Sequence, residues 1–277
     1  MSTKIRIDQL MLEKGLAESR NQAQRLVMAG QVRVDGQVVP KPSTKYSLTA
    51  DVSIDEGPRF VSRGGEKLQA AFEAFNLDVS GKVCADIGAS TGGFTDCLLQ
   101  HGALRVYAID VGKGLLHWKL RNHPRVTVME ETNARYVKRL QEPISLITVD
   151  VSFISLKVIL PVIRNWYSDC SITDGEKIKN QESQEALILI KPQFEAGKKV
   201  VAKGKGVVRD PEVHRKVILE VLKCSLENGF YLQGLISSPV LGPKGNIEFL
   251  AWLNRLEGQD YSHRTLEDIV SAIIPTG

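Results

Sequence analysis

The stretch that decides the fold reads Asp86-Ile87-Gly88-Ala89-Ser90-Thr91-Gly92-Gly93-Phe94-Thr95. The apolar run at residues 82–87 predicts a buried strand. The glycines predict a turn whose backbone passes close to a ligand, and residues 92–100 predict the start of a helix. The next apolar run ends in Ala108-Ile109-Asp110, so a second strand follows the helix.

Three kinds of nucleotide-binding loop fit this arrangement, and two of them require residues that the stretch lacks. A Walker loop needs Gly-x-x-x-x-Gly-Lys-Ser/Thr, and Phe94 occupies the lysine position although Gly88 and Gly93 have the right spacing. The dinucleotide fingerprint needs Gly-x-Gly-x-x-Gly, and Ser90 stands where a glycine must let a pyrophosphate approach. A ligand with an adenosine but no phosphate remains, and S-adenosylmethionine fits that description.

The backbone of the turn can hold the amino-acid end of S-adenosylmethionine. A carboxylate one strand later can hold its ribose hydroxyls, and we assign this role to Asp110. The alternative is an ordinary glycine-rich turn with a solvated aspartate. The predicted cofactor-binding residues are Asp86, Gly88, Ala89, Ser90, Gly92, Gly93, Phe94, Asp110, Val111 and Asn133.

Composition limits the class of protein. The 277 residues are 43% hydrophobic and 25% charged, which is typical of a globular protein with room for about two domains. No run approaches the roughly 18 to 20 apolar residues of a membrane span, and no hydrophobic signal region begins the chain, so we expect a cytoplasmic protein without membrane contacts. The four cysteines are scattered and lie near no histidine cluster, so neither disulfides nor a metal site is expected.

The first sixty residues predict a separate α+β module. Helices are expected at residues 8–13 and 19–29, the second with Ser19 as its N-cap and Gly30 at its end. Short strands are expected near residues 32–34, 38–39 and 52–55, with Asp35-Gly36 as a hairpin turn.

From residue 61 the pattern predicts an α/β domain with a parallel sheet, because strands and helices alternate. A helix is expected at residues 64–75, and strands at 83–87, 104–110, 125–130, 144–150 and 186–191. A long helix at 211–228 precedes two strand-like runs at 231–240 and 247–253. The stretch 168–185 is polar without periodicity, which predicts a mobile surface loop.

Four charged residues stand at predicted strand or helix ends, where an open parallel sheet places its ligands. They are Lys67, Asp150, Lys191 and Glu248. Each alone could be a surface charge or a member of a salt bridge. Two apolar strands that each end in a charge beside the glycine-rich turn favour a site instead.

The N-terminal module resembles the small RNA-binding domain of ribosomal protein S-four. The matching residues are Arg6-Ile-Asp-Gln-Leu, Ser19-Arg20-x-x-Ala23, Ala29-Gly30-Gln-Val32-x-Val34-Asp-Gly36 and Val39-x-Lys41-Pro42. The resemblance implies that Arg6, Ser19, Arg20 and Arg25 bind RNA, the arginines on a helical face that grips phosphates. Charge alone would favour a solvated basic face.

The remaining motifs, with this module, resemble the hemolysin-A type (TlyA-like) ribosomal RNA 2′-O-methyltransferases from about residue 6 to residue 253. They read Ser-Arg-Gly-Gly-x-Lys-Leu, Asp-x-Gly-Ala-Ser-Thr-Gly-Gly-Phe-Thr-Asp, Asp-Val-Ser-Phe-Ile-Ser-Leu, Lys-Pro-Gln-Phe-Glu, Gly-Val-Val-Arg-Asp-Pro and Ser-Pro-x-x-Gly-Pro-x-Gly-Asn-x-Glu-Phe-Leu. The resemblance implies a Rossmann-like methyltransferase sheet with a closing antiparallel hairpin, an RNA-binding domain at 1–60 and an FtsJ-like domain at 61–277. The departures are the 168–185 stretch and Phe60, where a tryptophan is frequent.

The Lys-Asp-Lys-Glu tetrad of FtsJ-like enzymes corresponds to Lys67, Asp150, Lys191 and Glu248. The sulfonium is already an activated methyl donor, so the enzyme aligns a ribose 2′-oxygen and removes its proton without a metal. The resemblance implies Lys191 as the general base and Asp150 as the residue that orients it and the cofactor. Lys67 would position the ribose hydroxyl or phosphate, Glu248 would fix Lys67 or the ribose, and these two roles could be exchanged.

The resemblance also implies ribosomal RNA or ribosomal subunits as partners and cytidines as targets, and we expect a monomer. Two alternatives remain. One is a cytolysin, which the family's name suggests but for which the sequence has neither a membrane span nor a strong amphipathic stripe. The other is a ribosome-binding factor without turnover, against which the complete tetrad and glycine-rich turn argue. A pseudouridine synthase can carry the same N-terminal module but needs no such turn.

Overall fold

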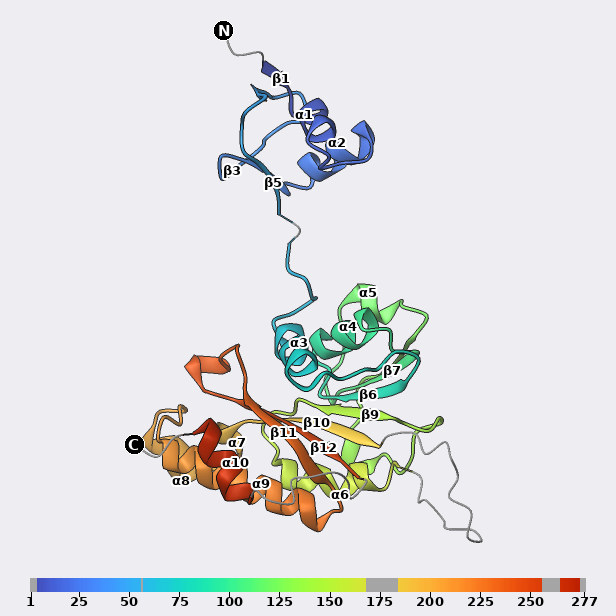
Figure 1. The fold of residues 1–277 in the computed structure, drawn as a ribbon. Coiled ribbons are helices and arrows are strands. Elements are labelled where there is room, and N and C mark those ends of the chain that lie inside the picture. The colour runs from blue at the N-terminus through green and yellow to red at the C-terminus, as the bar shows by residue number, and fades with distance from the viewer. Residues whose placement is uncertain (1–3, 56, 168–183, 256–264, 275–277) are drawn as a thin grey trace. The chain divides into compact units, whose positions relative to one another are not determined.

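The structure is a computed structural model, which describes residues 4–55, 57–167, 184–255 and 265–274. The chain divides into two compact units, Met1–Arg59 and Phe60–Gly277, each with its own hydrophobic core (Figure 1). This division lies one residue before the boundary that the sequence predicts between residues 60 and 61.

The N-terminal unit packs two helices against short antiparallel strands. Its helices are α1 (Ile7–Glu13) and α2 (Arg20–Met28), and its strands are β1 (Lys4–Arg6), β2 (Val32–Val34), β3 (Gln37–Val38), β4 (Lys45–Ser47) and β5 (Val52–Ile54). Strand β2 pairs with β3 and β5, while β1 pairs with β4. Ser19 Oγ accepts a hydrogen bond from Gln22 N at 3.3 Å, as expected of an N-cap. Asp35 and Gly36 have φ of 49° and 80°, the left-handed pair that a tight hairpin requires.

A seven-stranded sheet with the order β11-β12-β10-β9-β6-β7-β8 forms the centre of the second unit. Five strands are parallel: β6 (Val83–Ile87), β7 (Arg105–Ile109), β8 (Val126–Met129), β9 (Leu146–Val149) and β10 (Glu185–Ile190). Strands β11 (Tyr231–Ser237) and β12 (Phe249–Asn254) add an antiparallel pair beside β10. The predicted Rossmann-like sheet with a closing hairpin is therefore confirmed.

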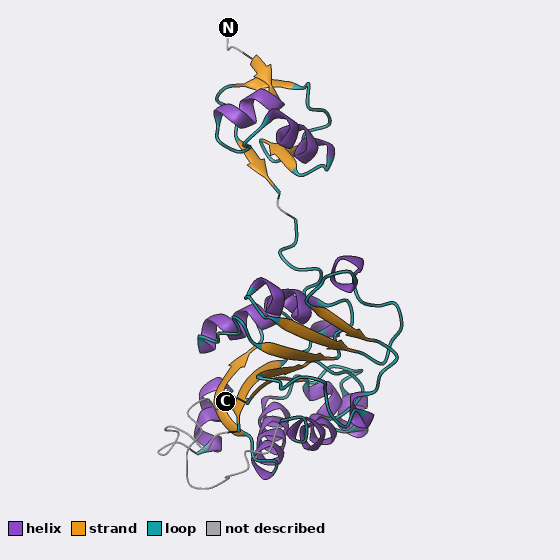
Figure 2. Ribbon diagram, turned by 90° about the vertical axis from the view of Figure 1, so that its right-hand side faces the viewer, coloured by secondary structure: helices purple, strands orange, loops and turns teal. Residues whose placement is uncertain are grey.

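Helices cover both faces of this sheet (Figure 2). Their bounds are α3 (Gly64–Phe75), α4 (Gly93–Gln100), α5 (Trp118–Arg121), α6 (Leu156–Arg164), α7 (Pro192–Glu195), α8 (Lys198–Lys203), α9 (Pro211–Glu227) and α10 (Leu266–Ile273), with 3₁₀ turns η1 (Ala134–Tyr136) and η2 (Pro243–Gly245). Alternate residues of β10 pack into the hydrophobic cores on the two faces of the sheet. Leu187 and Leu189 join the core under α3 and α4, whereas Ile188 and Ile190 join the core under α6 and α9.

The stretch predicted as a mobile loop lies mostly outside the described residues, since residues 168–183 are not described. The prediction is wrong for the last residue of this stretch, Glu185, which belongs to a strand. Glu185 is buried, begins β10 and lies 3.5 Å from the ammonium of Lys82. A charged residue at the start of a buried strand makes the strand look shorter in the sequence than it is. Within the described part of the chain, no helix has both the length and the apolar character that crossing a membrane requires.

Candidate active site

The predicted glycine-rich turn joins the carboxyl end of β6 to α4. Gly88 has φ of 84°, and a Cβ there would lie 2.3 Å from the carbonyl oxygen of Asp150. A Cβ on Gly93 would lie 2.4 Å from Ser62 Oγ and 2.7 Å from the backbone nitrogen of Gly65. These glycines therefore allow close packing of the turn against the end of β9 and the start of α3, in addition to leaving room for a ligand.

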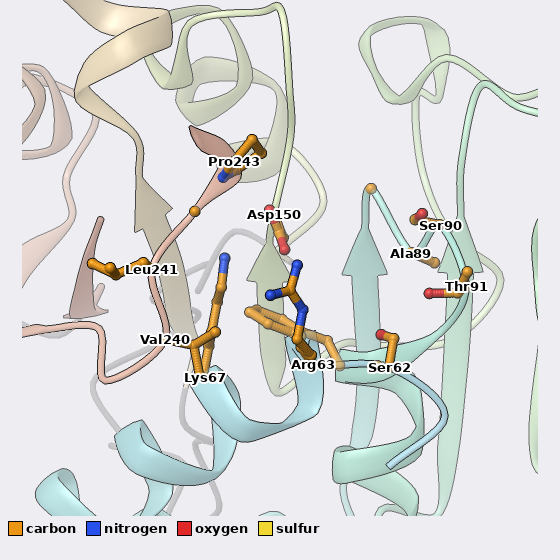
Figure 3. Close-up of a pocket in the computed structure, with 15 residues that line it drawn as sticks. Ser62, Arg63, Lys67, Ala89, Ser90, Thr91, Asp150, Val240, Leu241 and Pro243 are labelled. Atoms are coloured by element: carbon orange, nitrogen blue, oxygen red, sulfur yellow. The ribbon is translucent and has the colours of Figure 1, made fainter. Parts of the chain in front are cut away.

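A pocket of about 240 Å³ opens beside this turn (Figure 3). Its walls come from the turn, from the start of α3, from the end of β9 and from the segment between β11 and β12. Strand β6 lies between β7 and β9. The chain adds β7 and β8 on one side of β6 and then β9 and β10 on its other side, so the strand order reverses at β6. The pocket therefore lies at the switch point where open parallel sheets bind ligands. In Figure 3 the side chains of Arg63, which directly precedes α3, and of Lys67, on α3, point toward the strand end that carries Asp150.

Half of the predicted cofactor-binding residues line this pocket. They are Gly88, Ala89, Ser90, Gly93 and Phe94, and Thr91, which the prediction omitted, lines it too. The lining does not include Asp86, Gly92, Asp110, Val111 or Asn133. A Cβ on Gly92 would instead meet Leu120 Cδ1 at 2.2 Å. Val111 is exposed, and the Asn133 side chain accepts a hydrogen bond from the backbone nitrogen of Arg135.

Asp86 lies beneath the turn and has no exposed surface. Its carboxylate accepts hydrogen bonds from Thr95 Oγ1 at 2.6 Å and Thr148 Oγ1 at 3.0 Å, so it ties α4 to β9. Burial raises the pKa of Asp86 to about 7, and the nearby charge of Asp150 acts in the same direction, while the two hydroxyls oppose it. The structure gives Asp86 a position inside the fold and not on the pocket.

Asp110 holds the turn from the neighbouring strand. One carboxylate oxygen accepts a hydrogen bond from Ser90 N at 2.8 Å, and the other accepts one from Gly112 N at 2.7 Å. Its side chain thus connects the turn after β6 to the turn after β7. A cofactor ribose at this edge would have to share the carboxylate with these two backbone groups.

Glu130, which the sequence reasoning missed, organises the turn after β7. Its carboxylate accepts hydrogen bonds from the backbone nitrogens of Gly114, Leu115 and Leu116, and from Arg121 Nη2 at 2.7 Å. These hydrogen bonds lower the pKa of Glu130 to about 2, and the bond from Arg121 makes the largest contribution. The only sequence signal was an acidic residue directly after a strand.

The tetrad forms two ion pairs at the carboxyl edge of the sheet. Lys67 Nζ on α3 lies 2.5 Å from Glu248 Oε2, directly before β12. Lys191 Nζ, after β10, lies 2.5 Å from Asp150 Oδ1, after β9. Lys67 and Lys191 are each 8% exposed and Glu248 is fully buried. Lys67 and Asp150 line the pocket, whereas their ion-pair partners Glu248 and Lys191 are not among the lining residues.

Two polar neighbours complete these pairs. Lys191 Nζ donates a hydrogen bond to Ser152 Oγ at 3.0 Å, and Gln193 Nε2 donates one to Glu248 Oε1 at 2.8 Å. Each tetrad residue is therefore held by its ion-pair partner, and Lys191 and Glu248 also by a neutral side chain. Neither Ser152 nor Gln193 was singled out by the sequence, although both lie within quoted motifs.

Phe153 is a further residue that the sequence reasoning missed. It follows Ser152, is 91% exposed and has φ of 65°, a left-handed conformation that is rare for a bulky side chain. Its ring centroid lies 5.0 Å from that of Phe194, and Lys191 Nζ lies 5.6 Å from the Phe194 centroid. Strained backbone of this kind concentrates at functional sites.

The predicted RNA-binding residues of the N-terminal unit do not share one helical face. Arg6 ends strand β1 and does not lie on a helix. Arg20 and Arg25 both lie on α2, but they are five residues apart, so their side chains point in directions about 140° apart around the helix axis. The structure instead brings Arg6 and Arg20 together on Asp8, at 2.9 and 3.0 Å, and leaves Arg25 exposed near the end of the helix.

No cluster of three or more histidine, cysteine, aspartate or glutamate side chains capable of holding a metal ion occurs among the described residues. The three cysteines in that part of the chain, Cys84, Cys97 and Cys224, form no disulfide bond with one another. Burial raises the pKa of the Cys84 thiol to about 12, which makes this thiol unreactive.

Two known families match the two units. The family described as FtsJ-like methyltransferase matches residues 60–255, and the S4 domain matches residues 5–52. The chain is 44% identical to the putative rRNA methyltransferase YqxC of Bacillus subtilis, over 98% of this chain and 94% of that protein. It is 41% identical to the 16S/23S rRNA (cytidine-2′-O)-methyltransferase TlyA of Mycobacterium tuberculosis, over the whole of both chains.

A solved structure gives the same result. A putative hemolysin from Streptococcus thermophilus is 40% identical and superposes with a TM-score of 0.68, covering 98% of this chain and 96% of that one. The predicted resemblance is therefore confirmed in both units. The chain is a TlyA-like member of the FtsJ-like methyltransferase family with an N-terminal S4 domain.

Proposed function

We propose that this protein transfers a methyl group from S-adenosylmethionine to the ribose 2′-hydroxyl of cytidines in ribosomal RNA. The observation that carries the proposal is the placement of two lysine–carboxylate pairs at the carboxyl edge of the sheet, beside the glycine-rich turn. Family membership supports the reaction type, and the name of the Mycobacterium tuberculosis relative supports the substrate.

The side chains around the pocket fit the methyl donor. Its amino-acid end carries one positive and one negative charge, and its sulfonium is positive. The pocket offers the Asp150 carboxylate to the positive groups and the Arg63 guanidinium to the carboxylate. The turn adds backbone groups from Gly88 to Ser90. We assign Asp110, together with Val111 and Asn133, to the adenosine end.

When bound, S-adenosylmethionine supplies an activated methyl group. The residues of this chain then have to hold the ribose and take its proton. Lys191 Nζ accepts the proton of the 2′-oxygen after losing one of its own, and Asp150 and Ser152 fix the position of the amine. Lys67, held by Glu248, binds the ribose hydroxyl or its phosphate.

The exposed ring of Phe153, which contacts the ring of Phe194, supplies a surface for the target base. Proteins that recognise unpaired nucleotides stack the bases on aromatic side chains. Phe153 and Phe194 lie together beside Lys191, so a base stacked on Phe153 would bring its ribose close to the proposed general base.

We assign residues 1–60 to RNA binding and residues 61–277 to catalysis. The proposed reaction needs neither a metal nor a second copy of the chain, and a ribosomal RNA substrate places it in the cytoplasm. Some relatives carry hemolysin names, such as hemolysin A of Brachyspira hyodysenteriae at 41% identity. The sites described above, in the part of the chain that the structure describes, favour methyl transfer over lysis.

The test is to incubate the purified protein with S-adenosylmethionine and ribosomal subunits from cells that lack its gene, and then to map ribose methylation. New 2′-O-methylcytidine is the expected product. Methylation on a base, or none on either subunit despite cofactor binding, would contradict the proposal.

A further inference from the structure

The N-terminal unit buries one carboxylate among three polar side chains. Asp8 has no exposed surface, and both of its oxygens accept hydrogen bonds. Arg6 donates from Nε to Oδ1 at 3.0 Å and from Nη2 to Oδ2 at 2.9 Å. From α2, Arg20 Nε and Gln24 Nε2 donate to Oδ2 at 3.0 and 2.8 Å. These hydrogen bonds hold the pKa of Asp8 well below its usual range, and those from Arg6 make the largest contribution. The carboxylate is therefore ionised at neutral pH.

The arginines keep donors that face solvent. Their side chains are 34% exposed for Arg6 and 48% exposed for Arg20, whereas the carboxylate between them is fully covered. A guanidinium is a rigid planar fork, and Asp8 occupies only the Nε side of each group, so further N–H donors remain. Two guanidinium charges against one carboxylate also leave the cluster positive. This shape and charge match a phosphate group.

We propose that Asp8 and Gln24 are positioning residues that hold Arg6 and Arg20 as a preformed clamp for the phosphates of an RNA backbone. The inference rests on the RNA binding in the proposed function and adds how this unit achieves it. A free arginine loses side-chain freedom when it binds a phosphate, which weakens binding by roughly 2- to 10-fold per side chain. Fixing both arginines in the free protein removes that loss.

Simple electrostatics predicts the opposite sign. A carboxylate among arginines lowers the positive potential, so its removal should strengthen the binding of an anion. A clamp predicts that the same removal weakens binding, because the two guanidinium groups become mobile. The effect of Asp8→Asn on RNA affinity therefore separates the two accounts by direction.

The experiment measures binding of a fluorescent RNA stem-loop to the full-length protein over a salt series, without a methyl donor. For Asp8→Asn we expect affinity roughly 3- to 10-fold below wild type. The matched control is Glu13→Gln, because Glu13 is an exposed residue of the same helix and its substitution changes the net charge equally. We expect its affinity to equal or slightly exceed that of wild type.

Asp8 is buried, so Asp8→Asn could unfold the unit, which hydrogen exchange over residues 4–55 would reveal. Gln24→Met is the second variant, since it removes one neutral donor and leaves both arginine–Asp8 pairs and the charge intact. We expect it to remain folded and to bind about 2- to 3-fold more weakly.

Wild-type or tighter binding by a folded Asp8→Asn, or wild-type affinity in Gln24→Met, would overturn the clamp. If Asp8→Asn does not fold, Gln24→Met decides alone. A wild type that does not bind the RNA would overturn the clamp together with RNA binding. Because no methyl transfer is measured, a failure of the proposed reaction leaves this result readable.

Discussion

The two units of this chain combine cations and carboxylates in different proportions. In the catalytic unit each lysine meets one carboxylate: Lys67 pairs with Glu248 and Lys191 with Asp150. In the N-terminal unit one carboxylate, Asp8, meets two arginines. The first arrangement balances charge pair by pair, and the second leaves an excess of positive charge at the surface.

The choice of cation matches this difference. A lysine amine can lose its proton and accept another, whereas a guanidinium stays protonated in proteins and offers a fixed fork of donors. The lysine pairs therefore suit a site where a proton moves, and the arginine cluster suits constant attraction to phosphate. The chain separates proton transfer from RNA binding by residue type as well as by unit.

The largest expected effect comes from placing an arginine in the lysine site. Lys191→Arg keeps the positive charge but cannot provide a neutral base, so we expect single-turnover methyl transfer to fall by roughly 100-fold or more, as with Lys191→Ala. Affinity for S-adenosylmethionine, measured by calorimetry, should stay near wild type. An arginine variant that keeps a substantial fraction of the rate would make Lys191 an electrostatic clamp and remove the contrast between the units.

Removing residues 1–59 tests the same division from the other side. The catalytic unit has its own core, so it should remain folded and bind the cofactor with unchanged affinity. Without the arginine cluster, kcat/KM on intact ribosomal subunits should fall roughly 10- to 100-fold at physiological salt, and the rate should depend less steeply on salt. Full activity of the shortened protein would show that the catalytic unit binds its substrate unaided.

The sequence predicted the parts of both units that rest on local patterns. The apolar run before Gly88, the cap at Ser19 and the apolar run of β10 are each visible within a few residues. Strands β1 and β4 were missed because each has three residues and their pairing joins residues about 40 positions apart. Glu130, Gln24 and Ser152 were missed because their partners are set by tertiary structure, which a single sequence does not contain.

Phe153 sharpens the comparison, because it adds an aromatic contact that the arginine cluster lacks. Loss of base stacking in Phe153→Ala should lower kcat/KM roughly 10-fold, with cofactor affinity unchanged, while Phe153→Tyr should retain most activity. Phe153→Gly should lose the same fraction of kcat/KM as Phe153→Ala but be more stable than wild type. Glycine adopts φ of 65° without strain, and the lost ring is 91% exposed. A glycine variant with wild-type kinetics would remove Phe153 from the site.

The smallest expected effect on activity concerns a second comparison, between two buried aspartates. Asp8 lies among guanidinium groups that lower its pKa, and it stabilises the fold above its unfolded pKa, an effect lost in acid. Asp86 accepts hydrogen bonds from two hydroxyls and from the backbone of Thr95, and burial raises its pKa to about 7. Between its unfolded pKa near 4 and about 7 the folded state keeps a proton that the unfolded state has lost, so stability falls as pH rises through this window.

Asp86→Asn removes this pH dependence. The asparagine oxygen can accept the Thr95 hydroxyl, and its amide can donate to Thr148 Oγ1, whose own proton has the carbonyl of Ala85 at 3.3 Å as an acceptor. Relative to wild type, the variant should therefore gain on the order of 2 kcal/mol between pH 5 and pH 8, a melting temperature difference of a few degrees. Calorimetric melts across this range, with Asp78→Asn as an exposed control, measure the gain. A difference in melting temperature between Asp86→Asn and wild type that stays constant from pH 5 to pH 8 would mean that Asp86 does not titrate in this window. Its hydrogen-bond partners would then stabilise its charge as well as the arginines stabilise that of Asp8.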